Sequence, residues 1–190
     1  MSTIITSQPD EQIMTVNEIK HHLHVDHRED DSYFGLLITA ARQYIESFTM
    51  RAILPTVFQM NIDSFEDVIQ IPNPPLNEVI SILYVNTSGK TKTVSTSIYN
   101  VDTVSIPGRI SRVTAQSWPT TLNDINVISV HYSGGWEVSD IPQDLVICAK
   151  MLIGSWYENR ESTTDLKLMT VPLAVKNILN HYRTFATGNE

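Results

Sequence analysis

The chain has 190 residues, of which 42% are hydrophobic and 18% charged, with one cysteine and a net charge of −8. A chain of this length buries roughly 70% of its extended surface, so it needs neither a disulfide framework nor a metal to fold. It holds no apolar run of ~18 residues and no signal-peptide pattern, which predicts a soluble globular protein of a reducing compartment. No stretch clusters Lys and Arg, which argues against tight binding to nucleic acid or to an anionic membrane.

The first part of the chain predicts a flexible arm followed by two helices. Residues 1–14 are polar without periodicity and are expected to form the arm. Thr15-Val16-Asn17-Glu18 is a capping box that begins a short helix ending near Leu23. Asp30 or Asp31 is placed to cap a second helix, which ends near Thr49. Its apolar stripe has helical spacing and consists of Phe34, Leu37, Ile38, Ala41, Tyr44, Ile45 and Phe48.

Residues 52–135 have the pattern of a β-rich segment. Short β-branched and aromatic runs alternate with Pro, Asn, Gly and Ser, which predicts a small antiparallel sheet or barrel. Tyr84–Thr91 is expected to form a hairpin in which Gly89 takes a positive φ. The expected strands are Thr56–Ile62, Val68–Ile71, Val79–Asn86, Lys92–Val94, Ile98–Val101, Ile110–Val113 and Val127–Tyr132.

Two further helices are predicted after residue 136. Asp140 is expected to cap the first of them, with Pro142 in its first turn. This helix is apolar on almost every side and must be buried on every side. Its candidate core or inter-subunit residues are Leu145, Cys148, Met151, Leu152, Trp156 and Tyr157.

A polar connector, residues 158–165, leads to the last helix, which Thr170 is expected to cap and which has Pro172 in its first turn. The fold class is therefore α+β: a small bundle of four helices with an antiparallel β insertion between helices 2 and 3. The bundle comprises residues 15–51 and 136–190, and the insertion comprises residues 52–135.

No motif predicts catalysis, a metal or a cofactor. Ser88-Gly89-Lys90-Thr91 matches only the end of a phosphate-binding loop, because Tyr84 stands where the motif needs glycine. The histidines between His21 and His27 lack a second ligand cluster, so a solvated helix end explains them better than a metal site. Cys148 is interpreted as a small core residue, and no acid joins His131 and Ser133 into a catalytic set.

A series of short segments, spread in order from residue 15 to residue 183, resembles the head–tail connector (adaptor) proteins of tailed bacteriophages, prophages and gene transfer agents. Gly135, followed by Trp136, stands where that family has an aromatic residue after its chain-reversal glycine. The segments are Val16–Leu23, Asp30-Asp31, Leu36–Glu46, Ile71–Leu76, Trp118-Pro119, Gly134-Gly135, Ile141–Leu145, Trp156–Glu161 and Val171-Pro172.

The resemblance implies a non-enzymatic virion protein without cofactors. Such proteins assemble in the host cytoplasm as a ring, typically a dodecamer, on the portal protein at the head–tail junction. The ring presents a surface to a tail-proximal stopper or completion protein and forms a channel through which DNA passes. The acidic balance suits such a channel, because its wall should not grip phosphates.

The C-terminal helix has two interpretations that the sequence leaves open. It can be the portal-docking element, as the resemblance implies, or it can close the bundle of its own subunit. The candidate docking residues are Val171, Val175, Ile178, Leu179, Tyr182 and Arg183. Two other functions also stay open for the whole chain. One is a monomeric β-domain module that binds a ligand or another virion protein, and the other is a metal-dependent hydrolase built on the histidines.

Overall fold

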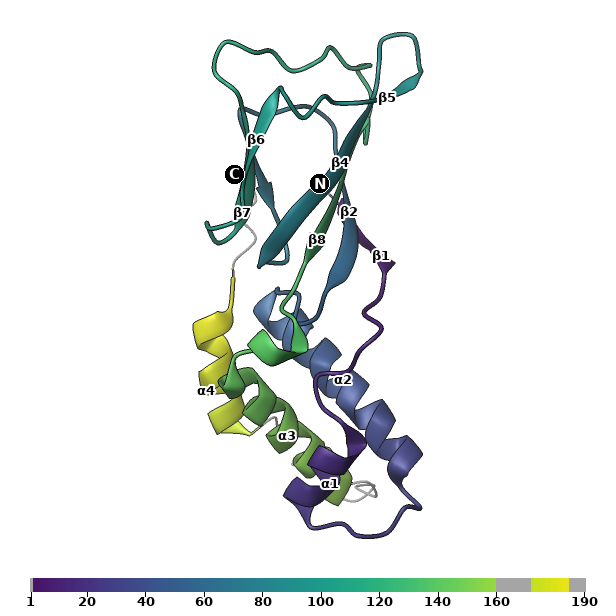
Figure 1. The fold of residues 1–190 in the computed structure, drawn as a ribbon, viewed down its shortest axis with the longest axis vertical. Helices are drawn as coiled ribbons and strands as arrows, with labels where there is room; N and C mark the ends of the chain where they lie inside the picture. Colours follow the sequence, from purple (N-terminus) through teal and green to yellow (C-terminus); the bar gives the residue numbers. More distant parts are fainter. Residues whose placement is uncertain (1, 160–171, 185–190) are drawn as a thin grey trace. The chain divides into compact units, whose positions relative to one another are not determined.

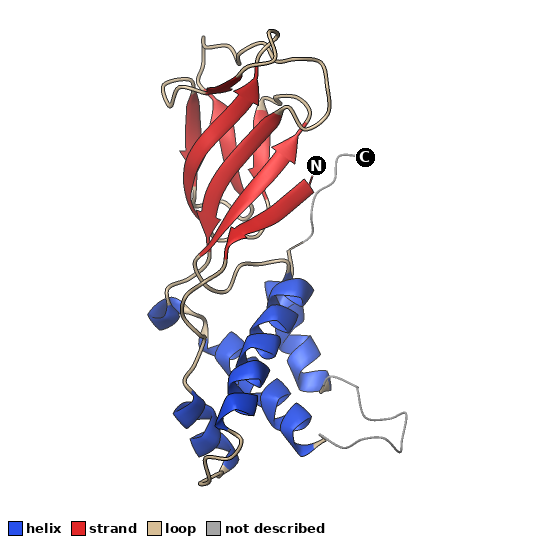
Figure 2. Cartoon of the chain, turned by 90° about the vertical axis from the view of Figure 1, so that its right-hand side faces the viewer, coloured by secondary structure: helices blue, strands red, loops and turns tan. Residues whose placement is uncertain are grey.

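The computed structural model describes residues 2–159 and 172–184. The chain divides into two compact units, each described here by itself (Figures 1 and 2). The helical unit contains Asp10–Leu54 and Trp136–Glu190, and the β unit contains Met1–Pro9 and Pro55–Gly135. The described residues form four α-helices and two antiparallel sheets, which confirms the α+β class.

The helical unit is built from α1 (Val16–Leu23), α2 (Asp31–Thr49), α3 (Gln143–Glu158) and α4 (Leu173–Tyr182), with a short 3₁₀ turn at Val138–Asp140. No helix in the described part of the chain is long and apolar enough to cross a membrane. The capping box of α1 is confirmed: the Glu18 amide donates to Thr15 Oγ1 at 3.2 Å, and the Thr15 amide donates to the Glu18 carboxylate at 2.6 Å. These bonds lower the pKa of Glu18.

The starts of the other helices differ from the prediction. Asp30 occupies the N-cap position of α2 but makes no side-chain cap bond. Its carboxylate instead accepts a hydrogen bond of 2.8 Å from the Tyr157 hydroxyl, which ties the start of α2 to the end of α3. Asp140 lies in the 3₁₀ turn rather than capping α3, and Pro142 takes the N-cap position. Pro172 likewise precedes α4, while Thr170 lies outside the described residues.

The core of the helical unit joins two segments that are about ninety residues apart in sequence. The predicted residues of α2 are buried against those of α3, and Trp156 packs against them half-buried. Phe34 also stacks on the Tyr157 ring, with the centroids 4.6 Å apart. The predicted core is therefore confirmed for Phe34, Leu37, Ala41, Ile45, Leu145, Ala149, Leu152 and Trp156.

A buried ion pair holds the chain as it leaves α2. Arg42 Nη1 lies 2.8 Å from the Glu46 carboxylate, and only 6% of the Arg42 side chain is exposed. The second oxygen of Glu46 accepts from the Ile53 amide at 3.2 Å. Because an unpaired charge is costly in a core, Glu46 both neutralises Arg42 and fixes the segment after the helix.

The β unit contains a five-stranded sheet with the strand order β1-β2-β8-β4-β5 and a three-stranded sheet with the order β3-β7-β6. All pairings are antiparallel. Figure 2 shows the strands of this unit in red. The strands are β1 (Ser2–Ser7), β2 (Thr56–Ile62), β3 (Val68–Ile71), β4 (Leu76–Val85), β5 (Thr91–Thr93), β6 (Tyr99–Asp102), β7 (Gly108–Arg112) and β8 (Ile128–Gly134).

The sheets approach each other closely where β7 passes β4. A Cβ atom at Gly108 would lie 2.6 Å from the Leu76 side chain, so only glycine fits there. Alternate residues of β2 and β8 point into the core: Phe58 and Tyr132 are buried and stack with ring centroids 5.2 Å apart. This burial raises the pKa of Tyr132.

Strand β1 corrects the expectation of a flexible arm over residues 1–14. It pairs with β2 from Ser2↔Asn61 to Ser7↔Val57, with a register shift after Ile5. All six residues are exposed. Since neither face of the strand is buried, its sequence has no apolar alternation from which a strand could be predicted.

Candidate interaction surfaces

The residues of the candidate chemical motifs occupy structural positions. Ser88-Gly89-Lys90-Thr91 forms the hairpin between β4 and β5, with Gly89 at φ 75°, as predicted. The Asn86 side chain accepts from the Ser88 and Lys90 amides, which fixes this turn. Across residues 2–159 and 172–184, no three His, Cys, Asp or Glu side chains are grouped as metal ligands. His131 and Ser133 lie in β8, opposite Gln59 and Val57 of β2.

The candidate residues of α3 fall into two groups. Leu145, Cys148 and Leu152 are fully buried within their own helical unit. Met151, Trp156 and Tyr157 are half-buried at its margin. The bundle thus covers most of the apolar surface of α3 without a partner, and of these six candidates only the margin residues have area left for a contact between subunits.

Cys148 is expected to be unreactive in the folded protein. Burial, and to a lesser degree the nearby Asp144 carboxylate, raise the pKa of its thiol to about 11, so the reactive thiolate is scarce at pH 8. We expect no labelling by a thiol-specific chromogenic reagent at pH 8 in the native protein. One thiol per chain should react after unfolding in guanidinium. Rapid labelling of the native protein would contradict the buried position.

The C-terminal helix lies in the bundle of its own subunit. Of its predicted stripe, Val175 and Leu179 are fully buried, while Ile178 and Tyr182 are half-buried against the same core. Arg183 is exposed, with its guanidinium carbon 5.8 Å from the centre of the Phe48 ring. Val171 lies outside the described residues. The face of α4 that remains free carries Leu173.

Polar contacts hold the chain after α4 against the end of α2. The Thr184 amide donates to the Thr49 carbonyl at 2.9 Å, and Arg51 Nε donates to the Tyr182 carbonyl at 2.5 Å. The Tyr182 hydroxyl donates to the Asp144 carboxylate at 3.2 Å. Burial and this carboxylate together raise the pKa of Tyr182. Backbone and side chains thus both attach α4 to its bundle.

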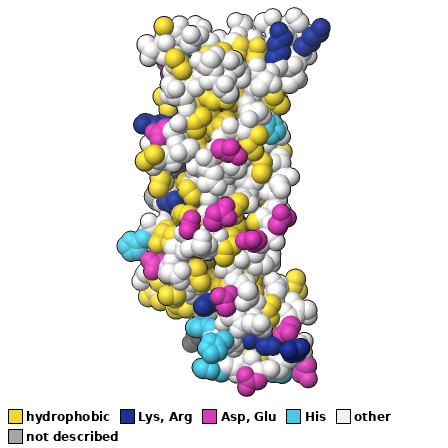
Figure 3. Space-filling model, in the orientation of Figure 1, with side chains coloured by type: hydrophobic (Ala, Val, Ile, Leu, Met, Phe, Trp, Pro, Cys, Tyr) yellow, Lys and Arg dark blue, Asp and Glu magenta, His cyan; other side chains and the backbone are white. Residues whose placement is uncertain are grey.

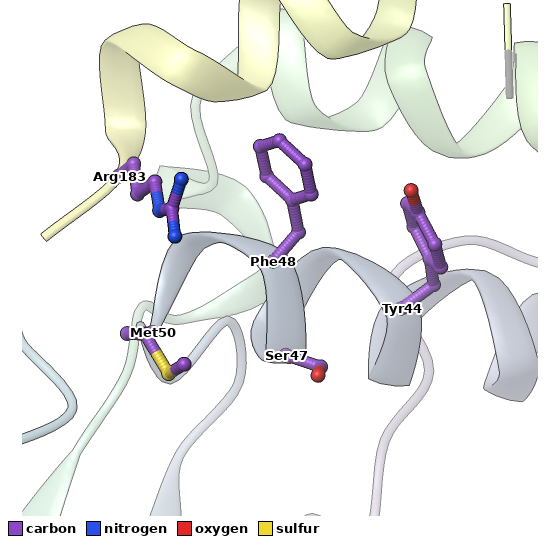
Figure 4. Close-up of a pocket in the computed structure, with 5 residues that line it drawn as sticks. All are labelled: Tyr44, Ser47, Phe48, Met50 and Arg183. Carbon is purple, nitrogen blue, oxygen red and sulfur yellow. The ribbon is translucent and has the colours of Figure 1, made fainter.

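A shallow pocket of about 260 Å³ opens where these segments meet. In Figure 4, Phe48 and Tyr44 project from one side of α2, whereas Ser47 and Met50 point to the other. Arg183 reaches toward the end of α2 from the segment after α4. The lining contains one charged group and no acid, so it does not provide a catalytic set.

The exposed face of α2 carries no charge. The exposed, uncharged residues of α2 and its C-cap recur every three or four positions, so they form one stripe along the helix. We call this stripe the neutral face; it consists of Ser32, Leu36, Ala40, Gln43, Ser47 and Met50, all exposed. The exposed face of a solvated helix normally carries charged residues, and their absence makes this face a candidate contact surface.

The loop between β6 and β7 is a second candidate surface. It exposes 90% of Val104 and 60% of Ile106. The Asp102 carboxylate accepts from the Ser105 hydroxyl, the Val104 and Ser105 amides and Arg109 Nε, at 2.7 to 3.1 Å. These bonds, those of Ser105 first, hold the pKa of Asp102 well below its usual range. The loop therefore presents apolar side chains on a fixed backbone.

Replacing Asp102 with alanine should loosen this loop without unfolding the β unit. We expect amide exchange at Val104 and Ser105 to accelerate by roughly tenfold or more, since both lose their acceptor. In the parent protein the protection should persist from pH 7 to pH 5. It should be lost only as the pH falls below the usual aspartate pKa of about 3.9, because the folded-state pKa is lowered. Asp124→Ala, in another loop, should leave both amides unchanged.

The surface charge is sparse and mixed. On the face shown in Figure 3, Lys and Arg form small separate groups, most of which lie near Asp or Glu. The chain has thirteen Lys and Arg residues against twenty-one Asp and Glu residues. On that face, the described residues form no basic stripe of the kind that tracks a nucleic-acid backbone.

Sequence reasoning missed three of these surfaces: strand β1, the neutral face and the β6–β7 loop. The neutral face had a usable signal, because the spacing that identified the buried stripe of α2 also identifies the uncharged residues opposite it. The loop had a weaker one, in the exposed run Val104-Ser105-Ile106. Strand β1 had none.

Comparison with known proteins gives one family and one fold. The family model for the phage gp6-like head-tail connector protein matches residues 13–112. No curated protein matches the chain. Among solved structures, a chain of the "Neck of empty GTA particle computed with C6 symmetry" has a TM-score of 0.80 at 18% identity, with 100% of this chain and 99% of that chain covered.

Two other structures give similar values. A chain of the "Virion of native gene transfer agent (GTA) particle" has a TM-score of 0.77, and a chain of the "Neck of native GTA particle computed with C12 symmetry" has 0.76. Both are 19% identical, and each comparison covers 100% of this chain and 99% of that chain. At these identities the likeness shows the fold.

Proposed function

The chain belongs to the phage gp6-like head-tail connector family, and from that premise we propose that it forms the ring between the portal and the tail-proximal stopper or completion protein. The observation that carries this proposal is the family match over residues 13–112, which spans α1, α2 and most of the β unit. In this proposal the helical bundle is the core of the subunit and the β unit is an insertion between α2 and α3.

The ring is proposed to contain twelve copies at the head–tail junction of the virion, assembled in the host cytoplasm. Two of the similar structures are necks with sixfold and twelvefold symmetry, which supports a ring. The neutral face of α2 supports it too, because an uncharged helix face can be covered by a neighbouring subunit without burying an unpaired charge.

The proposed channel passes DNA without binding it. The net charge of −8 and the scattered basic side chains support this role, since a wall that repels phosphate does not retain the duplex. No step of this function needs catalysis or a cofactor.

Portal docking is proposed for the C-terminal segment through its outer face. Val175 and Leu179 are buried in the bundle, so the docking contact is assigned to the outer face of α4, beginning with the exposed Leu173, and to the exposed Arg183 that follows the helix. Leu173→Asp should then weaken portal binding while the subunit stays folded, and Val175→Ala should destabilise the fold instead.

The deciding experiment is light scattering after size exclusion, on the chain alone and on the chain with its cognate portal protein. We expect a complex with the mass of the portal plus twelve chains, formed in the presence of the portal even if the chain alone is monomeric. A chain that stays monomeric and unbound with assembled portal would overturn the proposed function.

A second candidate is a monomeric module that binds another virion protein through the β unit. The fixed, apolar loop between β6 and β7 favours it, because Val104 is almost fully exposed. Val104→Asp distinguishes the two functions. It should abolish partner binding if the chain is a module of this kind, and it should leave assembly on the portal intact if the chain is a ring subunit.

A further inference from the structure

The five-stranded sheet of the β unit has two open edges among the described residues. One edge is β1. At the other edge, β5 pairs only with Leu83–Val85 of β4, and the Val94 amide donates to the Ile82 carbonyl. Residues 77–81 of β4 therefore have no strand beside them on that side.

β1 carries neither lysine nor proline, the residue types that most often protect an edge strand, whereas the open stretch of β4 contains the exposed Glu78 and two register shifts against β8. Natural edges carry lysine, proline or a covering segment, because unpaired backbone groups otherwise recruit another strand. β1 reads Ser-Thr-Ile-Ile-Thr-Ser, with no charge and no proline, and it exposes 51% of Ile4 and 50% of Ile5. The open stretch of β4 exposes 51% of Ile80.

The two edge strands, β1 and β4, have directions and positions along the sheet that allow them to pair. β1, β2, β8 and β4 are each antiparallel to the next, so β1 runs opposite to β4. Residues that are paired from strand to strand form a row across the sheet. Ile4 pairs with Gln59, Gln59 pairs with His131, and His131 pairs with Ser81, so the row of Ile4 ends at Ser81. By the same registers, β1 spans the rows from Leu83 to Glu78. The segment of β5 and Val94 occupies the rows of Leu83 and Ile82, so in a copy displaced sideways residues 4–7 of β1 would lie against the open rows from Ser81 to Glu78.

The charges at the ends of these edges are complementary. Beside β1, the chain continues past the end of β2 to the exposed Asp63. On the opposite edge, the hairpin carries Lys90 and Lys92, and Lys92 lies in the row of Ile62, next to that of Asp63. Both lysines are exposed, and neither forms an ion pair with any described residue. The same sideways step brings Asp63 of one copy toward these lysines of the next.

We propose that neighbouring copies join by continuing this sheet: β1 of one copy pairs antiparallel with residues 77–81 of β4 in the next. The proposal rests on the ring described above, which supplies the second copy. A contact between two different edges is heterologous, and such a contact closes into a ring when it is repeated by rotation. It also supplies backbone hydrogen bonds, which give affinity without large apolar side chains.

The ladder shows which backbone groups of β1 are free for this contact. The Thr6 hydroxyl donates to the Val57 carbonyl at 3.1 Å, so that carbonyl faces β1. Because bonding residues alternate along an antiparallel strand, Gln59 also faces β1 and bonds with Ile4. The amide of Ile5 therefore points outward, toward the neighbouring copy.

The test is a disulfide between copies, using Ile4→Cys together with Ser81→Cys. In the proposed pairing these residues form a pair without backbone hydrogen bonds, with Cα atoms about 4.5 Å apart, which a disulfide can bridge. Within one chain, three strand spacings separate them, about 14 Å, so no internal bridge can form. Rings assembled on the portal and oxidised should give a ladder of linked copies on a non-reducing gel.

Matched control variants show whether the disulfide is specific to the proposed pair of residues. Each single variant should give no ladder, and neither should Ile4→Cys combined with Ile106→Cys, another exposed isoleucine of the β unit. Ile5→Pro should lower ring assembly at least tenfold, because it removes an outward donor and leaves pairing with β2 intact, whereas Ile5→Ala should assemble almost normally. Circular dichroism checks that the proline variant is folded.

Each outcome decides between the two proposals. A ladder supports the sheet continuation, because it shows that the two edges meet in the assembled ring. Rings of the expected mass that give no ladder overturn the sheet continuation and leave the proposed function standing. If the parent chain forms no ring with the portal, the proposed function fails, and the sheet continuation fails with it.

Discussion

Removing residues 171–190 should unfold the helical unit. The deletion takes away α4, whose Val175 and Leu179 are fully buried, together with the Thr184 and Tyr182 contacts to the end of α2. Each large buried side chain that is lost costs about 2–5 kcal/mol, so the total approaches the whole stability of a typical domain, about 5–15 kcal/mol. Near-ultraviolet circular dichroism and thermal unfolding measure the effect.

The matched control removes only residues 185–190, which keeps every contact described above, and should unfold like the parent. A truncation before residue 171 that stays folded and still binds the portal would contradict docking by this segment. One that unfolds supports the interpretation that α4 closes its own bundle, and portal binding must then be tested with Leu173→Asp.

Replacing Leu152 with alanine should lower the free energy of unfolding by about 2–5 kcal/mol. The side chain is fully buried between α2 and α3, and the cavity left behind adds to the lost transfer energy. Urea denaturation measures it. Ile147→Ala on the same helix is the control, because this isoleucine is half-exposed and should cost far less. A loss below ~0.5 kcal/mol for Leu152→Ala would mean that another face of α3 is buried.

Most of the fold was predictable from hydrophobic spacing, because most helices and strands bury one face and expose the other. The second helix was predictable because Phe34, Leu37 and Ile45 recur at helical spacing, and the structure buries these residues. β2 and β3 match their predicted bounds, since their alternating residues face a core. The start of α3 was predicted two residues too early because Asp140 and Pro142 have the residue types expected of an N-cap and a first turn.

Contact surfaces were less predictable for a physical reason. A residue that faces a missing partner is exposed in one subunit, so its pattern resembles that of a solvated residue. In the proposed ring, Ile4 and Ile5 are such residues at the sheet edge, and Ser32 and Gln43 are such residues on α2; all four are exposed in the subunit. The stripe of α4 was open to two interpretations for the converse reason: Val175 and Leu179 could fill a groove in either the same or another molecule, and the structure places them in their own.

Both units are assembled from separated parts of the chain: β1 precedes the helices α1 and α2, and the helical core needs α3 and α4 from the far end. The β unit is therefore incomplete until β8 has left the ribosome, and the helical unit is incomplete until α3 and α4 have left it. During synthesis α1 and α2 have no partner for their apolar stripes, and folding must wait for contacts of long sequence separation. Nascent chains of this protein should consequently depend on chaperone capture, and a ribosome-stalled fragment ending before residue 135 should remain sensitive to protease throughout.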